Sequence, residues 1–245
     1  CDTALIAAAW SGEATRRCPE ARSSRRLPRQ WADSLLFQHA VSLVFQPQSI
    51  AARFGSLPPD FLKTFIADRS ALFSGGQTSR LPLELAQHQW PSLMARLQQQ
   101  LEREEGDFLF GEPSVADFAM AHPLWFLRGT PVTAPLVDDY PAVAAWLGRV
   151  LGFGHGSLSE MSGEEALAVA REATPAALPE ESLVEPNGFE VGQRVAIAAV
   201  DYGVDAVEGE LLFSGREELI LRREDPRAGI LHVHFPRLGF RIEAR

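Results

Sequence analysis

Cysteine is scarce in this sequence, and its scarcity excludes two kinds of stabilising site. Only Cys1 and Cys18 occur among 245 residues. A disulfide framework or a structural zinc site needs more cysteines at regular spacing. We therefore predict that both cysteines are free thiols.

Histidines at metal-ligand spacing are missing as well. His39, His88 and His122 stand far apart, with no second histidine four residues away on the same predicted helix. His232 and His234 would share one face of a strand, but no third ligand lies near them in the sequence. We therefore predict no metal site.

Long apolar runs are also absent. No run approaches the roughly 20 residues that a membrane-spanning helix needs, and no secretory signal pattern opens the chain. The hydrophobic content of 46% is ordinary for a soluble globule. The sequence therefore predicts a cytoplasmic location and no membrane partner.

An excess of positive charge is lacking too. The formal net charge of -9 disfavours nucleic acid as a partner, because phosphates require a basic face. Residues 16–30 are the exception, with six arginines and a single acid, Glu20. No aromatic residues interrupt this run, so we favour a solvated arginine-rich linker over a site for phosphate or RNA.

Residues 31–76 carry apolar side chains at helical spacing. Residues 31–55 are predicted to form one long helix. The next helix is predicted to follow Pro58-Pro59, with Asp60 as its cap, and to end at Gly75-Gly76.

A third helix is predicted from about Leu83 to Glu104. Pro91 lies inside it, and proline removes a backbone hydrogen bond from a helix. We therefore expect a kink or a break near residues 87–89.

A capping box begins the next helix. Ser114 can accept a hydrogen bond from the amide of Asp117, whose carboxylate can reach back to the amide of Ser114. Apolar side chains then cover every direction of the helical wheel: Phe118, Ala119, Met120, Ala121, Leu124, Trp125, Phe126 and Leu127. This pattern predicts a buried central helix.

Two further helices are predicted before the pattern changes. Pro141 lies in the first turn of one, and Ser162 with Glu165 forms a second capping box that begins the other, which ends before Pro175. Residues 176–186 are rich in Pro, Ala and Glu, a composition typical of a linker.

Beyond residue 187 the apolar residues alternate with a period of two, in five short runs separated by turn residues. Five strands in about 60 residues favour a small antiparallel barrel, since closure protects the edges of a sheet. Six arginines of this part could form a basic rim for an anionic partner, but we favour ordinary solvated turns: Arg216, Arg222, Arg223, Arg227, Arg237 and Arg241.

The pattern Phe-Leu-x-Gly-x-x-Ser-x-Ala-Asp-Phe at Phe108–Phe118 resembles the capping box of the glutathione S-transferase C-terminal domain. The resemblance implies a mainly α fold, a transferase-like helical bundle followed by the small β-barrel, with most of the N-terminal thioredoxin-like domain absent. The implied division of the chain is 1–15 as the end of that domain, 16–30 as the linker, 31–175 as the all-α domain, 176–186 as a linker and 187–245 as the barrel.

The pair Asp2-Thr3 is similar to the acidic residue and hydroxyl with which this family holds the γ-glutamyl end of glutathione. A carboxylate suits the ammonium group of the tripeptide, and a hydroxyl with helix amides suits its carboxylate. The alternative is that either residue simply caps a helix. The family's thiol-activating residue is expected upstream of Cys1, so no catalytic residue is assigned in this chain.

The first helix of the all-α domain lends its N-terminal half to the family's co-substrate pocket. Gln38, Val41, Ser42 and Phe45 are our candidates for that pocket, with core packing as the competing interpretation. The resemblance implies a homodimeric transferase that directs the thiolate of glutathione, its substrate, at a small hydrophobic electrophile. The alternative is a non-catalytic dimerising scaffold whose β-barrel binds a partner.

Overall fold

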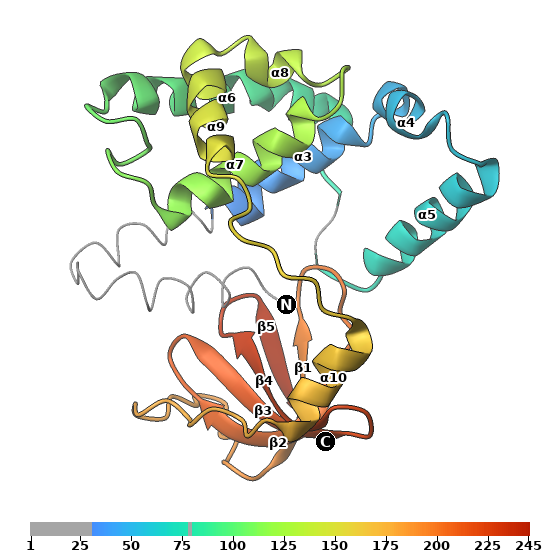
Figure 1. The fold of residues 1–245 in the computed structure, drawn as a ribbon, viewed down its shortest axis with the longest axis vertical. Coiled ribbons are helices and arrows are strands. Elements are labelled where there is room, and N and C mark those ends of the chain that lie inside the picture. The colour runs from blue at the N-terminus through green and yellow to red at the C-terminus, as the bar shows by residue number, and fades with distance from the viewer. Residues whose placement is uncertain (1–30, 78–79) are drawn as a thin grey trace. The chain divides into compact units, whose positions relative to one another are not determined.

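The computed structural model describes residues 31–77 and 80–245 (Figure 1). Within them the chain forms two compact units. The helical unit contains residues 31–65 and 80–157, and the sheet unit contains residues 66–77 and 158–245. The predicted linker at 16–30 and the pair Asp2-Thr3 lie outside the described residues. The predicted domain boundaries at 31–175 and 187–245 stay predictions.

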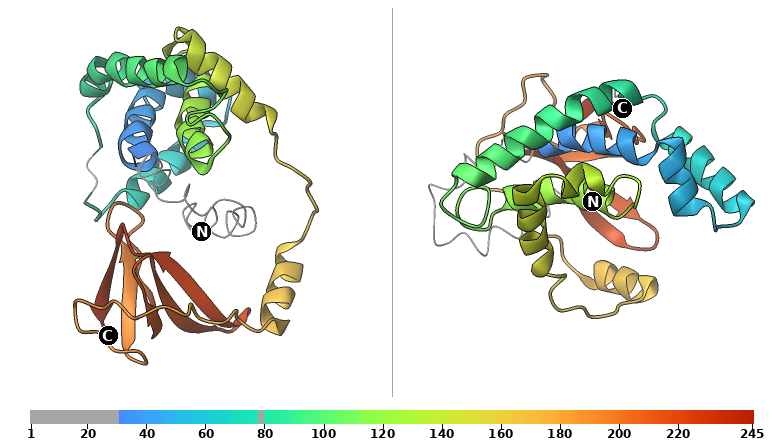
Figure 2. Two further views of the ribbon diagram at one scale, coloured as in Figure 1. Left: turned by 90° about the vertical axis from the view of Figure 1, so that its left-hand side faces the viewer. Right: turned by 90° about the horizontal axis from the view of Figure 1, so that it is seen from above.

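The helical unit begins with a π-helical turn, η3 (Ala32–Leu36), which continues into α3 (Phe37–Val44). The helices that follow are α4 (Pro47–Phe54), the first part of α5 (Pro59–Leu72), α6 (Leu83–Arg103), α7 (Val115–Arg128), α8 (Pro135–Asp138) and α9 (Pro141–Gly152). α7 lies at the centre, in contact with α3, α8 and α9, and α6 packs against α3 and α9 (Figure 2).

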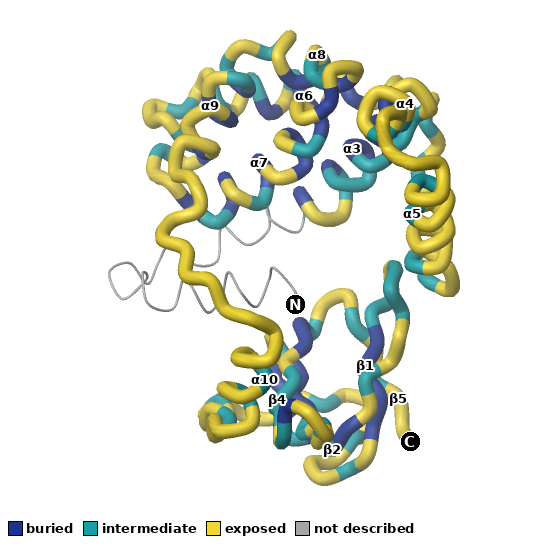
Figure 3. Tube along the Cα trace, turned by 45° about the vertical axis from the view of Figure 1, so that its right-hand side comes forward, coloured by how far each residue is buried: buried dark blue, intermediate teal, exposed yellow. Residues whose placement is uncertain are grey.

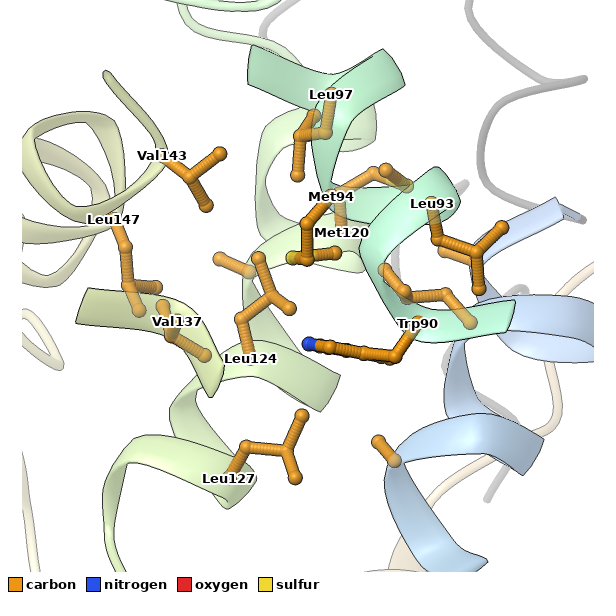
Figure 4. Close-up of a cluster of buried hydrophobic side chains, with 14 of the residues drawn as sticks. Trp90, Leu93, Met94, Leu97, Met120, Leu124, Leu127, Val137, Val143 and Leu147 are labelled. Atoms are coloured by element: carbon orange, nitrogen blue, oxygen red, sulfur yellow. The ribbon is translucent and has the colours of Figure 1, made fainter. Parts of the chain in front are cut away.

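The core of the helical unit forms where α6, α7 and α9 meet. Figure 4 shows Trp90, Leu93, Met94 and Leu97 of α6 together with Met120, Leu124 and Leu127 of α7, Val137 of α8, and Val143 and Leu147 of α9. The Trp90 indole donates a hydrogen bond to the backbone carbonyl of Leu136, at 2.8 Å. The one polar atom of this large side chain is thus satisfied inside the core.

The single long helix predicted for residues 31–55 is wrong, because the chain breaks between α3 and α4. Gln46 is extended (φ -69°, ψ 152°) and Pro47 begins the new helix. The proline ring disfavours the helical conformation of the residue before it, which forces this break. Two further details differ: α6 continues through Pro91 without the break that was one of the two expectations, and α5 begins at Pro59, so that Asp60 lies inside its first turn. The alternative expectation, a kink in α6, stays a prediction.

The expectation that α7 is buried all round is also wrong. Trp125 is 51% exposed and Phe118 is 38% exposed. These residues lie with His122 on one side of α7, where the imidazole stacks between the rings of Phe37 and Trp125. Phe118, His122 and Trp125 thus form an aromatic stripe that faces away from the core.

The start of α7 is built on a buried carboxylate. Asp117 has no exposed surface, and its Oδ1 accepts hydrogen bonds from the backbone amide of Leu109 at 2.8 Å and the indole of Trp146 at 2.9 Å. Its Oδ2 accepts from the amide of Ser114 at 2.9 Å and from the Ser114 hydroxyl at 2.7 Å. The carboxylate therefore joins the helix start to the preceding loop and to α9.

The sheet unit contains α10 (Gly163–Glu172) and five strands: β1 (Arg194–Ala199), β2 (Val207–Ser214), β3 (Glu218–Asp225), β4 (Gly229–Pro236) and β5 (Phe240–Ala244). All pairs are antiparallel, in the order β4-β3-β2-β1-β5. The five predicted strands are confirmed, as is the Ser162–Glu165 capping box of α10. The buried core of one face is Val195, Ile197, Leu211, Leu219, Leu221 and Phe235.

The predicted closed barrel is not confirmed, because the sheet is open. β4 and β5 are its two outermost strands, and they are not paired with each other in residues 187–245, all of which are described. Only residues 237–239 join them, and the four Cα–Cα steps from Pro236 to Phe240 reach about 14 Å at most, less than the width of a flat five-stranded sheet. The sheet must therefore curl, which a bulge between Leu211 and Phe213 of β2 assists, without completing a closed ladder.

The end of α5 and the loop after it pack on the β1–β2 loop inside the sheet unit. The Gly203 amide donates to the Leu72 carbonyl and the Gln77 amide to the Val200 carbonyl, both at 2.8 Å. The rings of Phe73 and Tyr202 lie 5.0 Å apart between centroids. Most of α5 remains exposed, as Figure 3 shows, so these contacts are its main anchor in this unit.

The turn between β3 and β4 is expected to weaken in acid. The amides of Arg227 and Ala228 donate to Asp225, and these bonds, led by that of Arg227, hold the pKa of its carboxyl below the ordinary 3.8. A carboxyl with a depressed pKa stabilises the fold above its unfolded pKa, and this contribution disappears as the pH falls through the folded pKa. An NMR titration should give a pKa below 3.8, and Asp225→Asn should abolish the acid-dependent exchange of the two amides.

Candidate functional site

The predicted co-substrate residues all lie on the first helical segment, and the structure brings only two of them to a cavity. Ser42 of α3 and Phe45, at the end of α3, line a cavity of about 300 Å³ in the helical unit. Gln38 and Val41 are half-buried and do not line it. Asp2 and Thr3, the predicted glutathione residues, lie outside the described residues.

The cavity forms where the break between α3 and α4 meets the segment that leads into α6. Its lining consists of Ser42, Phe45, Gln46, Pro47, Arg80, Leu81, Pro82 and Leu83. Two helix N-termini border it, because Gln46 precedes α4 and Pro82 precedes α6. The break that sequence periodicity missed therefore helps to create the cavity.

Ser42 fixes one wall of the cavity. Its side chain is buried, and its hydroxyl donates a hydrogen bond to the Leu81 carbonyl at 2.7 Å. This bond ties α3 to the segment that precedes α6, 39 residues further along the chain.

Replacing Ser42 with alanine is expected to lower the free energy of unfolding by about 1–2 kcal/mol, because the Leu81 carbonyl loses its partner. The measurement is urea unfolding followed by tryptophan fluorescence. Thr64→Val is the matched control within the helical unit, since the Thr64 hydroxyl makes the same kind of bond to the Asp60 carbonyl on an exposed surface. Equal effects of the two substitutions would contradict the assigned role of Ser42.

Phe45 supplies an aromatic wall that other rings hold in place. Its centroid lies 6.1 Å from that of Phe65 and 6.0 Å from that of Phe126. The Arg53 guanidinium lies over the Phe126 ring, 4.8 Å from its centroid. Ring contacts from α5 and α7 therefore fix this wall, and Arg53 of α4 packs on Phe126 behind it, which favours a preformed site.

Arg80 is the charged member of the lining, and sequence reasoning missed it. Its guanidinium donates to the Phe45 carbonyl at 3.3 Å. No carboxylate forms an ion pair with it within residues 31–77 and 80–245. The side chain is exposed, so it can contact a ligand at the mouth of the cavity.

The chain matches known proteins. The family model of the glutathione S-transferase C-terminal domain matches residues 83–149, from α6 to α9. The solved structure of a GST-like protein from Pseudomonas syringae is 54% identical to this chain, with a TM-score of 0.81. That match covers 100% of this chain and 78% of the other. The chain belongs to the glutathione S-transferase family. None of the curated proteins matches it.

Membership of the glutathione S-transferase family supports a glutathione-related function at the level of the family. The matched segment contains Asp117 and the core helices, whereas Ser42 and Phe45 precede it. The resemblance first noted at Phe108–Phe118 thus identified the family from a part of the chain that maintains the fold.

Metal and membrane features complete the description of this glutathione S-transferase-like chain. In the part of the chain that the structure describes, no three His, Cys, Asp or Glu side chains gather as metal ligands would. Across the same residues, none of the helices combines the length and the apolar character needed to cross a bilayer.

Proposed function

We propose that this protein is a glutathione-dependent transferase that joins the glutathione sulfur to a small electrophile. The observation that supports this proposal most strongly is the 54% identity, over 100% of the chain, with a GST-like protein. The open cavity beside Ser42 and Phe45 is the proposed place for the electrophile, because most of its lining residues are apolar and its volume suits a small ligand.

The proposed reaction is a displacement at carbon. The glutathione thiol loses its proton to solvent water, and the thiolate sulfur forms a bond to the electrophilic carbon. With an aryl chloride as electrophile, the carbon–chlorine bond breaks and chloride leaves with the electron pair. Asp2 is proposed to receive the ammonium group of glutathione, and Thr3 its γ-glutamyl carboxylate.

The proposal also includes a homodimer in the cytoplasm, as the family resemblance implies. Its domain division is the one inferred from the sequence, with an all-α domain at 31–175 and a β domain at 187–245.

The test uses protein expressed from the complete gene. It should bind to immobilised glutathione, elute with free glutathione, and convert chlorodinitrobenzene to its thioether with release of chloride. Heat-denatured protein and omission of glutathione serve as controls. Failure to bind glutathione, together with no thiol-dependent turnover of a panel of electrophiles, would instead favour the non-catalytic dimerising scaffold with a partner-binding β domain.

A further inference from the structure

We propose that the cavity beside Ser42 and Phe45 selects a small aromatic ligand that carries an anionic group, with Arg80 as the partner of the anion. This inference rests on the proposed function, because the ligand would be the electrophile. It goes further by naming the chemical class of that ligand and a residue that determines specificity.

The size and the walls of the cavity favour a single aromatic ring. A cavity of about 150 Å³ lined with apolar side chains is known to accept benzene, whereas this one is about 300 Å³ and thus has room for a ring with substituents. The Phe45 ring provides a face or an edge for stacking, and its contacts with Phe65 and Phe126 hold it ready.

The charge at the cavity favours an anion. A guanidinium has five N–H donors, and the described contacts of Arg80 use one side of it, for the Phe45 carbonyl. No described carboxylate neutralises this cation. A planar carboxylate on the ligand can therefore take the geometry that arginine recognises best.

The two helix N-termini that border the cavity also attract an anion, but more weakly than Arg80 does. Neither Gln46 before α4 nor Pro82 before α6 caps its helix with a side chain, so the first-turn amides keep donors available. Glu84 in the first turn of α6 opposes this effect, but it is exposed and does not line the cavity. Arg80 is consequently the decisive group.

The experiment compares two unreactive probes of nearly equal shape, nitrobenzoate and nitrobenzamide, by equilibrium dialysis against the full-length protein without glutathione. Wild-type protein should bind the anionic probe more tightly, and its affinity should fall as the ionic strength rises. Arg80→Gln should weaken nitrobenzoate binding by about tenfold or more and leave nitrobenzamide binding unchanged.

Arg96→Gln is the matched control, because it removes the same charge from an exposed position of α6 outside the cavity lining. It should leave the affinity for both probes unchanged. Equal binding of the two probes to the wild-type protein, or retention of nitrobenzoate affinity by Arg80→Gln, would overturn the proposal. A urea unfolding curve of each variant checks that it is folded.

Turnover separates this inference from the proposed function. Chlorodinitrobenzene and chlorodinitrobenzoate are assayed with glutathione. Arg80-dependent nitrobenzoate binding without turnover of either compound would refute the transferase and leave the anion site standing. Turnover with the same preference for both compounds in wild-type and Arg80→Gln protein would refute the anion site and leave the transferase standing.

Discussion

Replacing Asp117 with asparagine is expected to lower the free energy of unfolding of the helical unit by about 3–5 kcal/mol. The carboxylate has no exposed surface and accepts four hydrogen bonds through its two oxygens. An asparagine has one carbonyl oxygen, so its amide group must face two donors on the other side. Either the Leu109 amide and the Trp146 indole, or the two Ser114 donors, lose their acceptor.

Tryptophan fluorescence can follow this loss specifically. Four of the five tryptophans lie in the helical unit, none lies in residues 158–245, and Trp10 lies outside the described residues. Unfolding in urea, detected through the indoles, therefore reports mainly on the helical unit, and the midpoint should fall sharply in Asp117→Asn.

Asp138→Asn is the control for the loss of a carboxylate. Asp138 pairs with Arg128 at 3.0 Å, and both side chains are well exposed, at 44% and 39%. Solvent screens such a pair, so its loss should change the stability by less than about 1 kcal/mol. If Asp117→Asn unfolded no earlier than Asp138→Asn, the buried carboxylate would not be the anchor of α7.

The start of α7 could be predicted from the sequence because its contacts are local. Ser114 and Asp117 are three residues apart, and the spacing alone brings the carboxylate to the Ser114 amide. The other two donors were not predictable. Leu109 and Trp146 reach the same carboxylate through the tertiary fold, Trp146 from 29 residues away.

Helical periodicity overestimated the burial of α7 for a physical reason. An aromatic side chain has the same apolar pattern whether it lies in a core or in an exposed stack. Trp125 is half-exposed because its ring stacks on His122 and not on the core. The side chains of α7 are apolar, as the helical wheel indicated. Whether each one is buried depends on side chains from other segments, which the wheel does not include.

The candidate cavity was only half predictable for a similar reason. Ser42 and Phe45 lie on a helix that the sequence indicates, so they could be proposed from their position. Arg80 stands in an irregular segment 35 residues after Phe45, and only folding places its guanidinium at the Phe45 carbonyl. The openness of the sheet was equally hidden, since strand periodicity does not say which strands pair at the edges.

Replacing Gly76 with alanine is expected to lower the free energy of unfolding of the sheet unit by about 2–3 kcal/mol. A Cβ atom at this position would lie 1.7 Å from the backbone carbonyl oxygen of Asp201. The atoms that this Cβ would meet belong to the backbone of Asp201 and Tyr202, so no flexible side chain can move aside to make room. The loop must therefore separate from the β1–β2 loop, with loss of the bonds from Gln77 to Val200 and from Gly203 to Leu72.

Hydrogen exchange at the Gln77 and Gly203 amides measures this separation directly, and both should exchange faster in Gly76→Ala. Gly148→Ala is the matched control: Gly148 lies in α9, is exposed, and an added Cβ would meet no atom within 4 Å. Alanine should there stabilise the helix by about 0.5–1 kcal/mol. The same substitution is thus expected to act with opposite signs at the two sites. Unchanged exchange in Gly76→Ala would show that the end of α5 is not held by the β1–β2 loop.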